Sequence, residues 1–414
     1  MKVRNYALVT AGYWAFTLTD GALRMLVLLH FHELGYSALS IAFLFLAYEF
    51  MGIVTNLLGG WVGARTGLNR TLVGGLALQI VALAALTLHR PDWQEWLSVL
   101  FVMSVQALSG VAKDLTKMSS KSAVKAVAGT GDGALFRLVA ILTGSKNALK
   151  GVGFFVGAAL LSWIGYDAGL WAMAVALAIT LVALLAMLDE DLGRSKRKPP
   201  LRSILSKSPA VNRLSAARFF LFGSRDIWFV VALPVFLDEQ LGWSYQGIGG
   251  FLATWVIGYG IVQSFAPRVL RRRGATTFDE IRAARRWAAI LAVVTASIAA
   301  MVAFDAAVTT AVVGGLLVFG LVFAVNSSLH SFLILAYSDD DEVALDVGFY
   351  YSANAAGRLV GTLLSGLCYL WGGLEGALWG SAAFLALTWL LTLRLPPLAH
   401  HPTTHPPIRL PTPR

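Results

Sequence analysis

Long apolar stretches recur along the whole sequence, and each is long enough to form a helix across a membrane. A transmembrane helix needs about 20 mostly apolar residues. We predict twelve such spans, at approximately 6–31, 38–62, 71–88, 96–115, 135–164, 168–188, 215–237, 246–269, 287–304, 309–335, 347–371 and 377–395. Hydrophobic residues make up 57% of the 414 residues and charged residues only 14%, whereas a soluble domain has about 25% charged residues. The sequence therefore predicts an all-α integral membrane protein and excludes a soluble enzyme, a disordered chain and a nucleic-acid-binding module.

Lysine and arginine are concentrated in alternate loops, which predicts the orientation of the chain, because cytoplasmic loops carry an excess of these residues. With the N-terminus in the cytoplasm, the inner segments contain basic clusters at 2–4, 65–70, 117–125, 194–213 and 268–286. The outer loops contain only Arg90. One inner loop, 338–342, is acidic, but acidic residues contribute little to orientation. We predict a multi-pass membrane protein with both termini in the cytoplasm.

The longest polar interruption lies between the sixth and seventh predicted spans and divides the chain into two six-helix halves. We predict halves at 1–190 and 213–395, a basic cytoplasmic loop at 191–212 and a disordered proline-rich tail at 396–414. The small-residue spacings Gly153/Gly157 and Gly357/Gly361 predict close packing between helices. The single cysteine, Cys368, excludes a disulfide framework and a thiolate metal centre, and we predict neither a metal nor a cofactor.

The loop after the second predicted span contains a recognisable motif. Residues 60–70 read Gly-Trp-Val-Gly-Ala-Arg-Thr-Gly-Leu-Asn-Arg. Together with the two six-helix halves, this segment resembles the loop motif of the major facilitator superfamily, in which Gly and three residues precede Asp-Arg. Ala64 stands at the position of the motif's Asp, and a tight turn with orienting arginines is the alternative interpretation. The resemblance implies a 12-helix fold whose two halves surround a central cavity.

Six further segments resemble a narrower family. They are YWAFTLTDGALRM at 13–25, AYEF at 47–50, AKDLTKMSSK at 112–121, LTGSKNALKG at 142–151, ARFFLFGSRD at 217–226 and GFYY at 348–351. Together they resemble the organoarsenical efflux permeases of arsenic-resistance operons. This resemblance implies export of 1-arseno-3-phosphoglycerate, the unstable product that forms when glyceraldehyde-3-phosphate dehydrogenase uses arsenate instead of phosphate. It also implies functional coupling to that dehydrogenase, and it assigns no role to any single residue.

Ionisable residues within the predicted spans indicate where a ligand binds. Eight basic residues lie at or near membrane depth: Arg24, Lys113, Arg137, Lys146, Lys150, Arg218, Arg225 and Arg358. The carboxylates at this depth are Asp20, Glu49, Asp114 and Asp226. A charged group at the centre of a membrane helix costs about 2.5–3.5 kcal/mol, so it normally faces a partner or a water-filled cavity. The surplus of positive charge predicts an anion-binding cavity near the midplane.

Helical spacing narrows the candidates for substrate binding. Residues four apart lie on one face of a helix, as Lys146 and Lys150 do in the fifth predicted span. Asn354 and Arg358 share a face of the eleventh span in the same way. The residues that we predict to bind the substrate are Arg24, Lys146, Lys150, Arg225, Asn354 and Arg358. The alternative for Arg24 is a structural ion pair with Asp20, four residues earlier. The basic residues that we expect near helix ends, with side chains reaching toward the membrane surface, are Lys113, Arg137 and Arg218.

The residues that we predict to serve proton coupling or structural ion pairs are Asp20, Glu49, Asp226 and His330. Glu49 has no basic neighbour in the sequence, so it is either a proton-coupling carboxylate or the partner of a lysine from another helix. His330 shares a helix face with Asn326 and either transfers protons or is a hydrogen-bonded structural residue.

Together with the resemblance, these observations predict a secondary active exporter of a pentavalent organoarsenical anion in the bacterial inner membrane, working by alternating access, and not an enzyme. Trivalent arsenic binds soft thiolates, and one cysteine cannot form a site of two or three thiols. Arginine and lysine instead suit an oxyanion ester. A permease for a native organophosphate and a membrane sensor that binds without transport are the alternatives. We expect a monomer, because each chain contains its own cavity.

Overall fold

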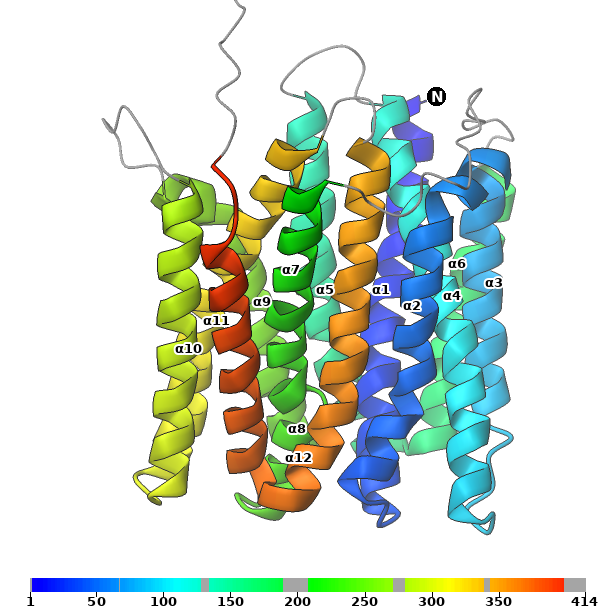
Figure 1. The fold of residues 1–414 in the computed structure, drawn as a ribbon. Coiled ribbons are helices and arrows are strands. Elements are labelled where there is room, and N and C mark those ends of the chain that lie inside the picture. The colour runs from blue at the N-terminus through cyan, green and yellow to red at the C-terminus, as the bar shows by residue number, and fades with distance from the viewer. Residues whose placement is uncertain are drawn as a thin grey trace, which may run out of the picture.

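The computed structural model describes residues 2–66, 68–127, 134–188, 208–270, 280–338 and 343–397, and every regular element in these ranges is an α-helix (Figure 1). The first six helices are α1 Lys2–Glu33, α2 Ala38–Thr66, α3 Leu68–Leu86, α4 Glu95–Val127, α5 Ala134–Ile164 and α6 Tyr166–Met187. The others are α7 Pro209–Phe229, α8 Ala232–Glu239, α9 Tyr245–Leu270, α10 Glu280–Ala303, α11 Val308–Tyr337 and α12 Val343–Leu393. Helices are expected for so apolar a chain, because within lipid a helix satisfies its backbone hydrogen bonds internally.

The twelve predicted spans are all present as helices, although the boundaries between elements differ. Helices α7 and α8 form one span together, and α12 contains the last two spans. The last two spans meet at Gly372 and Gly373, where the chain reverses direction at the lower end of the bundle (Figure 1). Gly373 has a φ angle of +58°, which glycine adopts without steric cost. Nine helical stretches of the described residues are long and apolar enough to cross a membrane by length and composition alone.

The break between α7 and α8 has a cause in the sequence. Pro234 has no backbone N–H, and in an unbroken helix its ring would clash with the carbonyl group four residues earlier, at Val230. The backbone N–H groups of Val231 and Ala232 instead donate hydrogen bonds to Ser365 Oγ on α12, at 3.1 Å each. A neighbouring helix therefore satisfies the groups that the break leaves unpaired.

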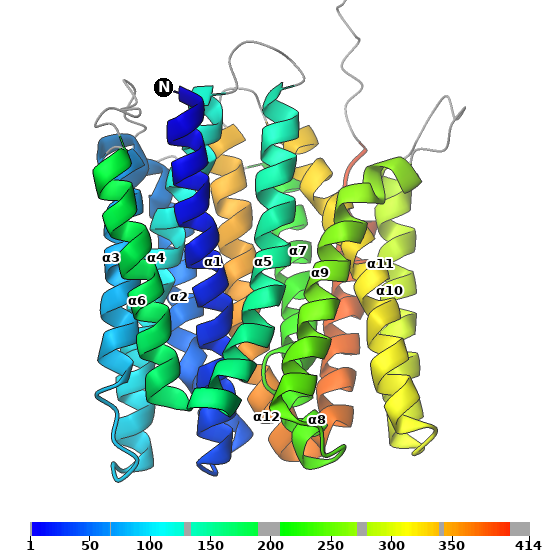
Figure 2. The ribbon, with the colours of Figure 1, turned by 180° about the vertical axis from the view of Figure 1, so that it is seen from behind.

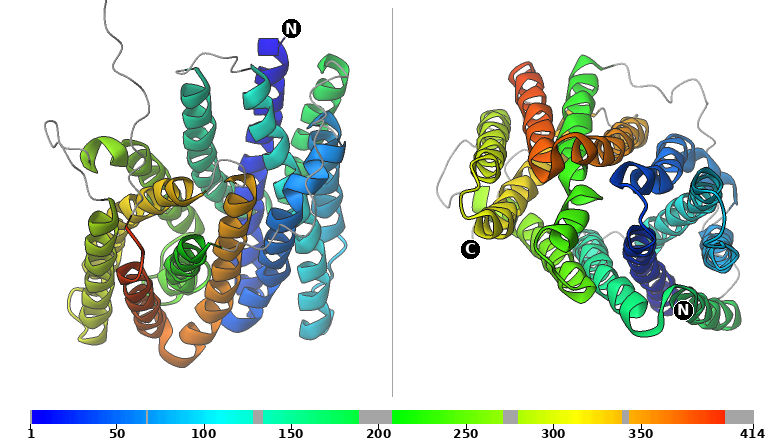
Figure 3. Two further views of the ribbon diagram at one scale, coloured as in Figure 1. Left: turned by 45° about the horizontal axis from the view of Figure 1, so that its top comes forward. Right: turned by 90° about the horizontal axis from the view of Figure 1, so that it is seen from below.

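The helices form two halves that face each other, α1–α6 and α7–α12 (Figure 3). Helix α2 of the first half packs along α12 of the second, and α5 packs along α9. Seen from behind, α5 lies between α1 and α9 (Figure 2). Four helices therefore form most of the interface between the halves.

Apolar side chains cover the outside of the bundle. On α6, Ile179, Val182 and Leu185 are 66%, 65% and 61% exposed. Such exposure of large aliphatic side chains is unfavourable in water but favourable against lipid tails. Helix α6 therefore lies at the lipid-facing side of the first half.

Glycines allow the closest helix crossings within each half. A Cβ atom on Gly153 or Gly157 of α5 would collide with the backbone of α1, at Leu18 and Ala22 respectively. In the second half, Gly357 and Gly361 of α12 lie in the same way against the backbone of α7. The predicted role of these glycine spacings in close packing is confirmed.

Several helices extend beyond the apolar stretches that predicted them. Helix α4 continues to Val127, whereas its predicted span ends at 115. Helix α7 begins at Pro209, inside the predicted loop 191–212, because proline is favoured in the first turn of a helix. Residues 189–207 and 398–414, which contain most of the predicted loop and tail, lie outside the described residues.

Candidate functional site

A cavity of about 1430 Å³ lies between the two halves. Its lining comes from α1, α2, α4 and α5 of the first half and from α7, α9, α11 and α12 of the second. Ligand pockets commonly have volumes of about 300–1,000 Å³. This cavity is therefore large enough for a small organic molecule together with its hydration water.

The cavity extends from the middle of the bundle toward its upper end, where α1 begins (top of Figure 1). Lining residues near this end are Asn56, Lys117, Phe265 and Tyr351. At the opposite, lower end, residues outside the cavity lining join the halves. There His32 Nε2 lies 3.0 Å from Asp238 Oδ2, and Gln246 donates a hydrogen bond to Ser162 Oγ at 2.5 Å. The two ends of the bundle therefore differ in how the halves meet.

Positive charge dominates the cavity lining. The basic residues of the lining are Arg24, Lys113, Lys117, Lys146, Lys150, Arg218, Arg225 and Arg358. The acidic residues of the lining are Asp20, Glu49 and Asp114. Asp226 is not part of the lining but pairs with two arginines that are, Arg225 and Arg358. Eight basic groups thus face four carboxylates within the described residues. Arg137, which was predicted near a helix end, has its side chain outside the described part of the chain, whereas Lys117 was predicted only as part of the basic cluster of an inner loop.

A network of ion pairs crosses from one half to the other at the buried end of the cavity. Glu49 Oε1 on α2 accepts hydrogen bonds from Arg24 Nη2 at 2.6 Å and from Arg358 Nη2 at 2.5 Å. Arg358 Nε donates to Asp226 Oδ2 at 3.0 Å, and Arg225 pairs with the same carboxylate. Glu49 is 1% exposed, so its charge depends on these two arginines. The network joins α1 and α2 to α12 and α7.

Two expectations about ion pairs are corrected by this network. Arg24 does not pair with Asp20, because its guanidinium group reaches Glu49 on α2, and Asp20 accepts a hydrogen bond from the Tyr48 hydroxyl at 2.6 Å. Glu49 pairs with two arginines and not with a lysine. Arg225 also pairs with its sequence neighbour Asp226, because the long arginine side chain folds back onto the adjacent carboxylate.

Arg218 lies deep in the bundle, and the expectation that it extends to the membrane surface was wrong. Its Nε donates to Asn354 Oδ1 at 3.0 Å, and its Nη1 lies 3.3 Å from both Ser327 O and Ser327 Oγ. The guanidinium carbon lies 3.8 Å from the centre of the Phe222 ring. Asn354, which we predicted to bind substrate, lines the cavity and also positions Arg218.

Lys113 and Lys150 enter the cavity from the first half. The Lys113 ammonium group lies over the Tyr48 ring at 4.0 Å from its centre, and Lys150 lies 5.8 Å from the centre of the Phe154 ring. Lys113 Nζ also lies beside Gly52, where a Cβ atom would be 3.5 Å from it, an ordinary van der Waals contact. Lys113 was expected at a helix end, whereas Lys146 and Lys150 line the cavity as their spacing predicted.

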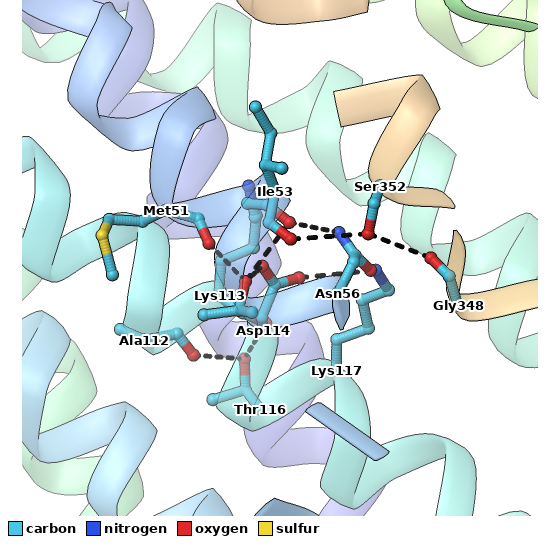
Figure 4. A network of polar contacts seen from close by, with 12 residues as sticks. Met51, Ile53, Asn56, Ala112, Lys113, Asp114, Thr116, Lys117, Gly348 and Ser352 are labelled. Atoms are coloured by element: carbon cyan, nitrogen blue, oxygen red, sulfur yellow. Dashed lines mark hydrogen bonds and ion pairs between the residues drawn. The ribbon is translucent and has the colours of Figure 1, made fainter. Parts of the chain in front are cut away.

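A second polar network lies at the upper part of the cavity, around Asp114 (Figure 4). Its carboxylate accepts hydrogen bonds from Thr55 and from Lys117 Nζ, the latter at 3.4 Å. Lys117 also donates to Asn56 Oδ1 at 3.1 Å. Ser352 of the second half donates to the carbonyl group of Ile53 at 3.4 Å, which connects α12 to this part of α2.

His330 lies away from the cavity. It is fully buried on α11 and is absent from the cavity lining, and neither ring nitrogen has a hydrogen-bond partner among the described residues. Asn326, on the same face, donates to the carbonyl groups of Trp287 and Val322. The structure therefore does not bring His330 together with the other predicted site residues. Within the described residues, no group of three or more His, Cys, Asp or Glu side chains is placed to hold a metal ion.

Two halves of six spans around a charged cavity are an architecture typical of secondary membrane transporters. The family model of the Major Facilitator Superfamily matches residues 9–278 and 214–413, so the chain belongs to this superfamily. A search of curated proteins gives no match to the chain.

Solved structures with the same fold include transporters of different substrates. A bacterial homologue of the iron transporter ferroportin in an inward-facing state aligns with a TM-score of 0.69 and 16% identity over 95% of this chain and 98% of that one. A human organic anion transporter aligns with a TM-score of 0.66 and 16% identity over 94% and 99% of the two chains. A POT family transporter in complex with a thioalcohol-conjugated peptide reaches 0.73 and 14% identity over 93% and 94%. At such identities the likeness establishes the fold alone.

Proposed function

We propose that this transporter exports a pentavalent organoarsenical anion, 1-arseno-3-phosphoglycerate, and thereby confers resistance to arsenate. The observation that carries the proposal is the cavity lining, in which eight basic groups face four carboxylates. Fixed positive charge that internal carboxylates do not balance favours binding of an anion with several negative charges. Arginine and lysine bind phosphoryl oxygens well, and an arsenate ester is similar to a phosphate ester in shape and charge.

The orientation predicted from loop charge and the shape of the cavity support export as the proposed direction of transport. With the N-terminus in the cytoplasm, the upper end of the bundle faces the cytoplasm, where the dehydrogenase forms the substrate. The cavity extends toward that end, while His32 and Asp238 hold the halves together at the other. This arrangement suits the loading step of an exporter that works by alternating access in the bacterial inner membrane.

The proposed transport unit is a single chain. Helices of both halves line one cavity, so no second copy is needed to complete it. We propose that 1–190 and 213–395 move relative to each other as the two halves, linked by the basic loop 191–212, and that the tail 396–414 takes no part in transport.

Arsenate resistance tests the proposal in cells. An arsenate-sensitive bacterium that expresses the chain should tolerate several-fold more arsenate than the same strain with an empty vector. Lys146→Ala and Arg225→Ala should lose this advantage, because each removes a basic group from the cavity lining, while Arg90→Gln, which changes an exposed outer-loop residue, should keep it. Equal amounts of each variant in the membrane fraction are required. Unchanged tolerance on expression of the parent chain would contradict the proposal.

A permease for a native organophosphate is the second candidate, because the same basic cavity suits a phosphate ester. It predicts uptake of phosphoglycerate into vesicles without any transport of arsenic. A membrane sensor predicts that neither compound moves.

A further inference from the structure

Three of the cavity's basic residues differ from the others in their partners. Among the residues that the structure describes, no carboxylate lies within ion-pair distance of Lys113, Lys150 or Arg218. Two of them belong to α4 and α5 of the first half, and Arg218 belongs to α7 of the second. A buried charge without a counter-ion is costly, so it calls for an anionic ligand.

We propose that these residues form two separate anion-binding poles, so that the substrate carries a negative group at each end. Lys113 and Lys150 form the pole of the first half, and Arg218 forms the pole of the second. The proposal rests on the proposed function in one respect, that the cavity holds the transported anion. It goes further by assigning the two anionic groups of the substrate to residues of different halves.

The pole of the first half consists of two ammonium groups held by aromatic rings. Lys113 lies over Tyr48 and Lys150 over Phe154, and no hydrogen bond from either ammonium group to a described residue is present. An aromatic face attracts a cation without occupying its N–H donors. Both ammonium groups therefore keep donors available for the oxygens of a ligand.

The pole of the second half is a rigidly positioned guanidinium group. Arg218 is 4% exposed and stacks on Phe222, while neutral acceptors on Asn354 and Ser327 bind its Nε and Nη1. These acceptors fix its orientation but supply no negative charge. Its Nη2 makes no hydrogen bond to a described residue, so one donor group of the arginine remains for a ligand.

The remaining arginines of the cavity are already paired with carboxylates. Arg24 and Arg358 share Glu49, and Arg225 and Arg358 pair with Asp226. Their charges are therefore largely balanced without a ligand. A ligand with one anionic group leaves one pole without a counter-ion, whereas a ligand with two groups neutralises both and connects the halves.

Binding to the purified full-length transporter in detergent tests the proposal by isothermal titration calorimetry. Three stable probes differ in the number of charged groups: 3-phosphoglycerate carries a phosphate and a carboxylate, glycerol 3-phosphate only the phosphate, and inorganic phosphate has no carbon chain. Hydrogen bonds to charged groups contribute about 1.5–3 kcal/mol. We therefore expect 3-phosphoglycerate to bind about tenfold or more tightly than glycerol 3-phosphate.

Variants at each pole decide whether both poles act. Lys150→Gln and Arg218→Gln should each lower the affinity for 3-phosphoglycerate about tenfold. The variant at the pole that binds the carboxylate should leave the affinity for glycerol 3-phosphate unchanged. Arg218→Lys keeps the charge and serves as a second variant if the glutamine form does not fold. Arg90→Gln, at an exposed site outside the cavity, should bind every probe like the parent.

Two results would overturn the two-pole site. One is equal affinity of the parent for 3-phosphoglycerate and glycerol 3-phosphate. The other is a pair of variants that weaken both probes by the same factor, as a single anion site would require. Because no probe contains arsenic, these results are independent of arsenate resistance, and a two-pole profile without resistance would refute the arsenical substrate while leaving the proposed site intact.

Discussion

Glu49 illustrates what a buried charge in this bundle requires of its neighbours. It is 1% exposed and accepts hydrogen bonds from arginines of opposite halves, Arg24 and Arg358. The sequence predicted its depth in the membrane but not these partners, because they lie on helices distant in the chain. We interpret Glu49 as a structural connection between the halves in this conformation.

Removal of the Glu49 charge should therefore destabilise the protein. Glu49→Gln leaves two buried arginines without their shared carboxylate, and loss of one partner of a buried ion pair costs about 3–5 kcal/mol. We expect a lower midpoint of thermal unfolding in detergent and weaker transport. Glu33→Gln, the same change at the exposed end of α1, serves as the control and should unfold like the parent. A Glu49→Gln protein with unchanged stability would show that the ion pairs contribute nothing.

The depth of two site residues was misjudged for a physical reason. Hydropathy detects only the apolar part of a helix, so Lys113 and Arg218 were predicted to lie close to helix ends. In the structure α4 continues to Val127 and α7 begins at Pro209, so both residues lie well inside longer helices. The spacing of Asn354 and Arg358 predicted their shared exposure to the cavity, because both residues lie on one helix.

At the level of the helices, close crossings depend on glycine. Gly157 of α5 lies against the carbonyl group of Ala22 on α1, and this crossing holds Lys150 and Arg24 on adjacent helices of the cavity wall. A pattern of small residues predicts such a crossing from sequence, because any Cβ atom would separate the two backbones. The partner helix is not predictable in this way.

A methyl group at this crossing should disrupt the first half. Gly157→Ala forces α1 and α5 apart, so we expect little monodisperse protein after extraction and a lower unfolding midpoint. Gly74→Ala is the matched control, because a Cβ atom on Gly74 would meet no atom within 4 Å. The control should be as stable as the parent or slightly more stable, since alanine favours helix over glycine by about 0.5–1 kcal/mol. Similar behaviour of the two variants would contradict the role of the crossing.

At the scale of the whole molecule, the two halves repeat one arrangement. Gly157 lies on Ala22 in the first half, and Gly361 lies on Gly223 in the second. Arg24 and Arg225 each follow the contacted residue of α1 or α7 by two positions, and both belong to the ion network. Such matching of the halves is typical of this transporter architecture.

The fold was predictable from sequence to a much greater extent than the site. Apolar length and loop charge predicted twelve spans in two halves, because the membrane imposes both features on each segment separately. The surplus of cavity charge was also predictable, since it depends only on which residues lie at membrane depth. The pairing of those charges was not, because it depends on the packing of α2 against α12 and of α5 against α9.

Transport of arsenic into everted membrane vesicles tests the central claim most directly. Vesicles that contain the transporter receive arsenate, glyceraldehyde 3-phosphate, NAD and glyceraldehyde-3-phosphate dehydrogenase, so that the unstable ester forms beside the membrane. The account predicts that arsenic accumulates inside only when both the transporter and the dehydrogenase are present. Accumulation without the dehydrogenase, or none with both proteins present, would contradict export of the organoarsenical anion.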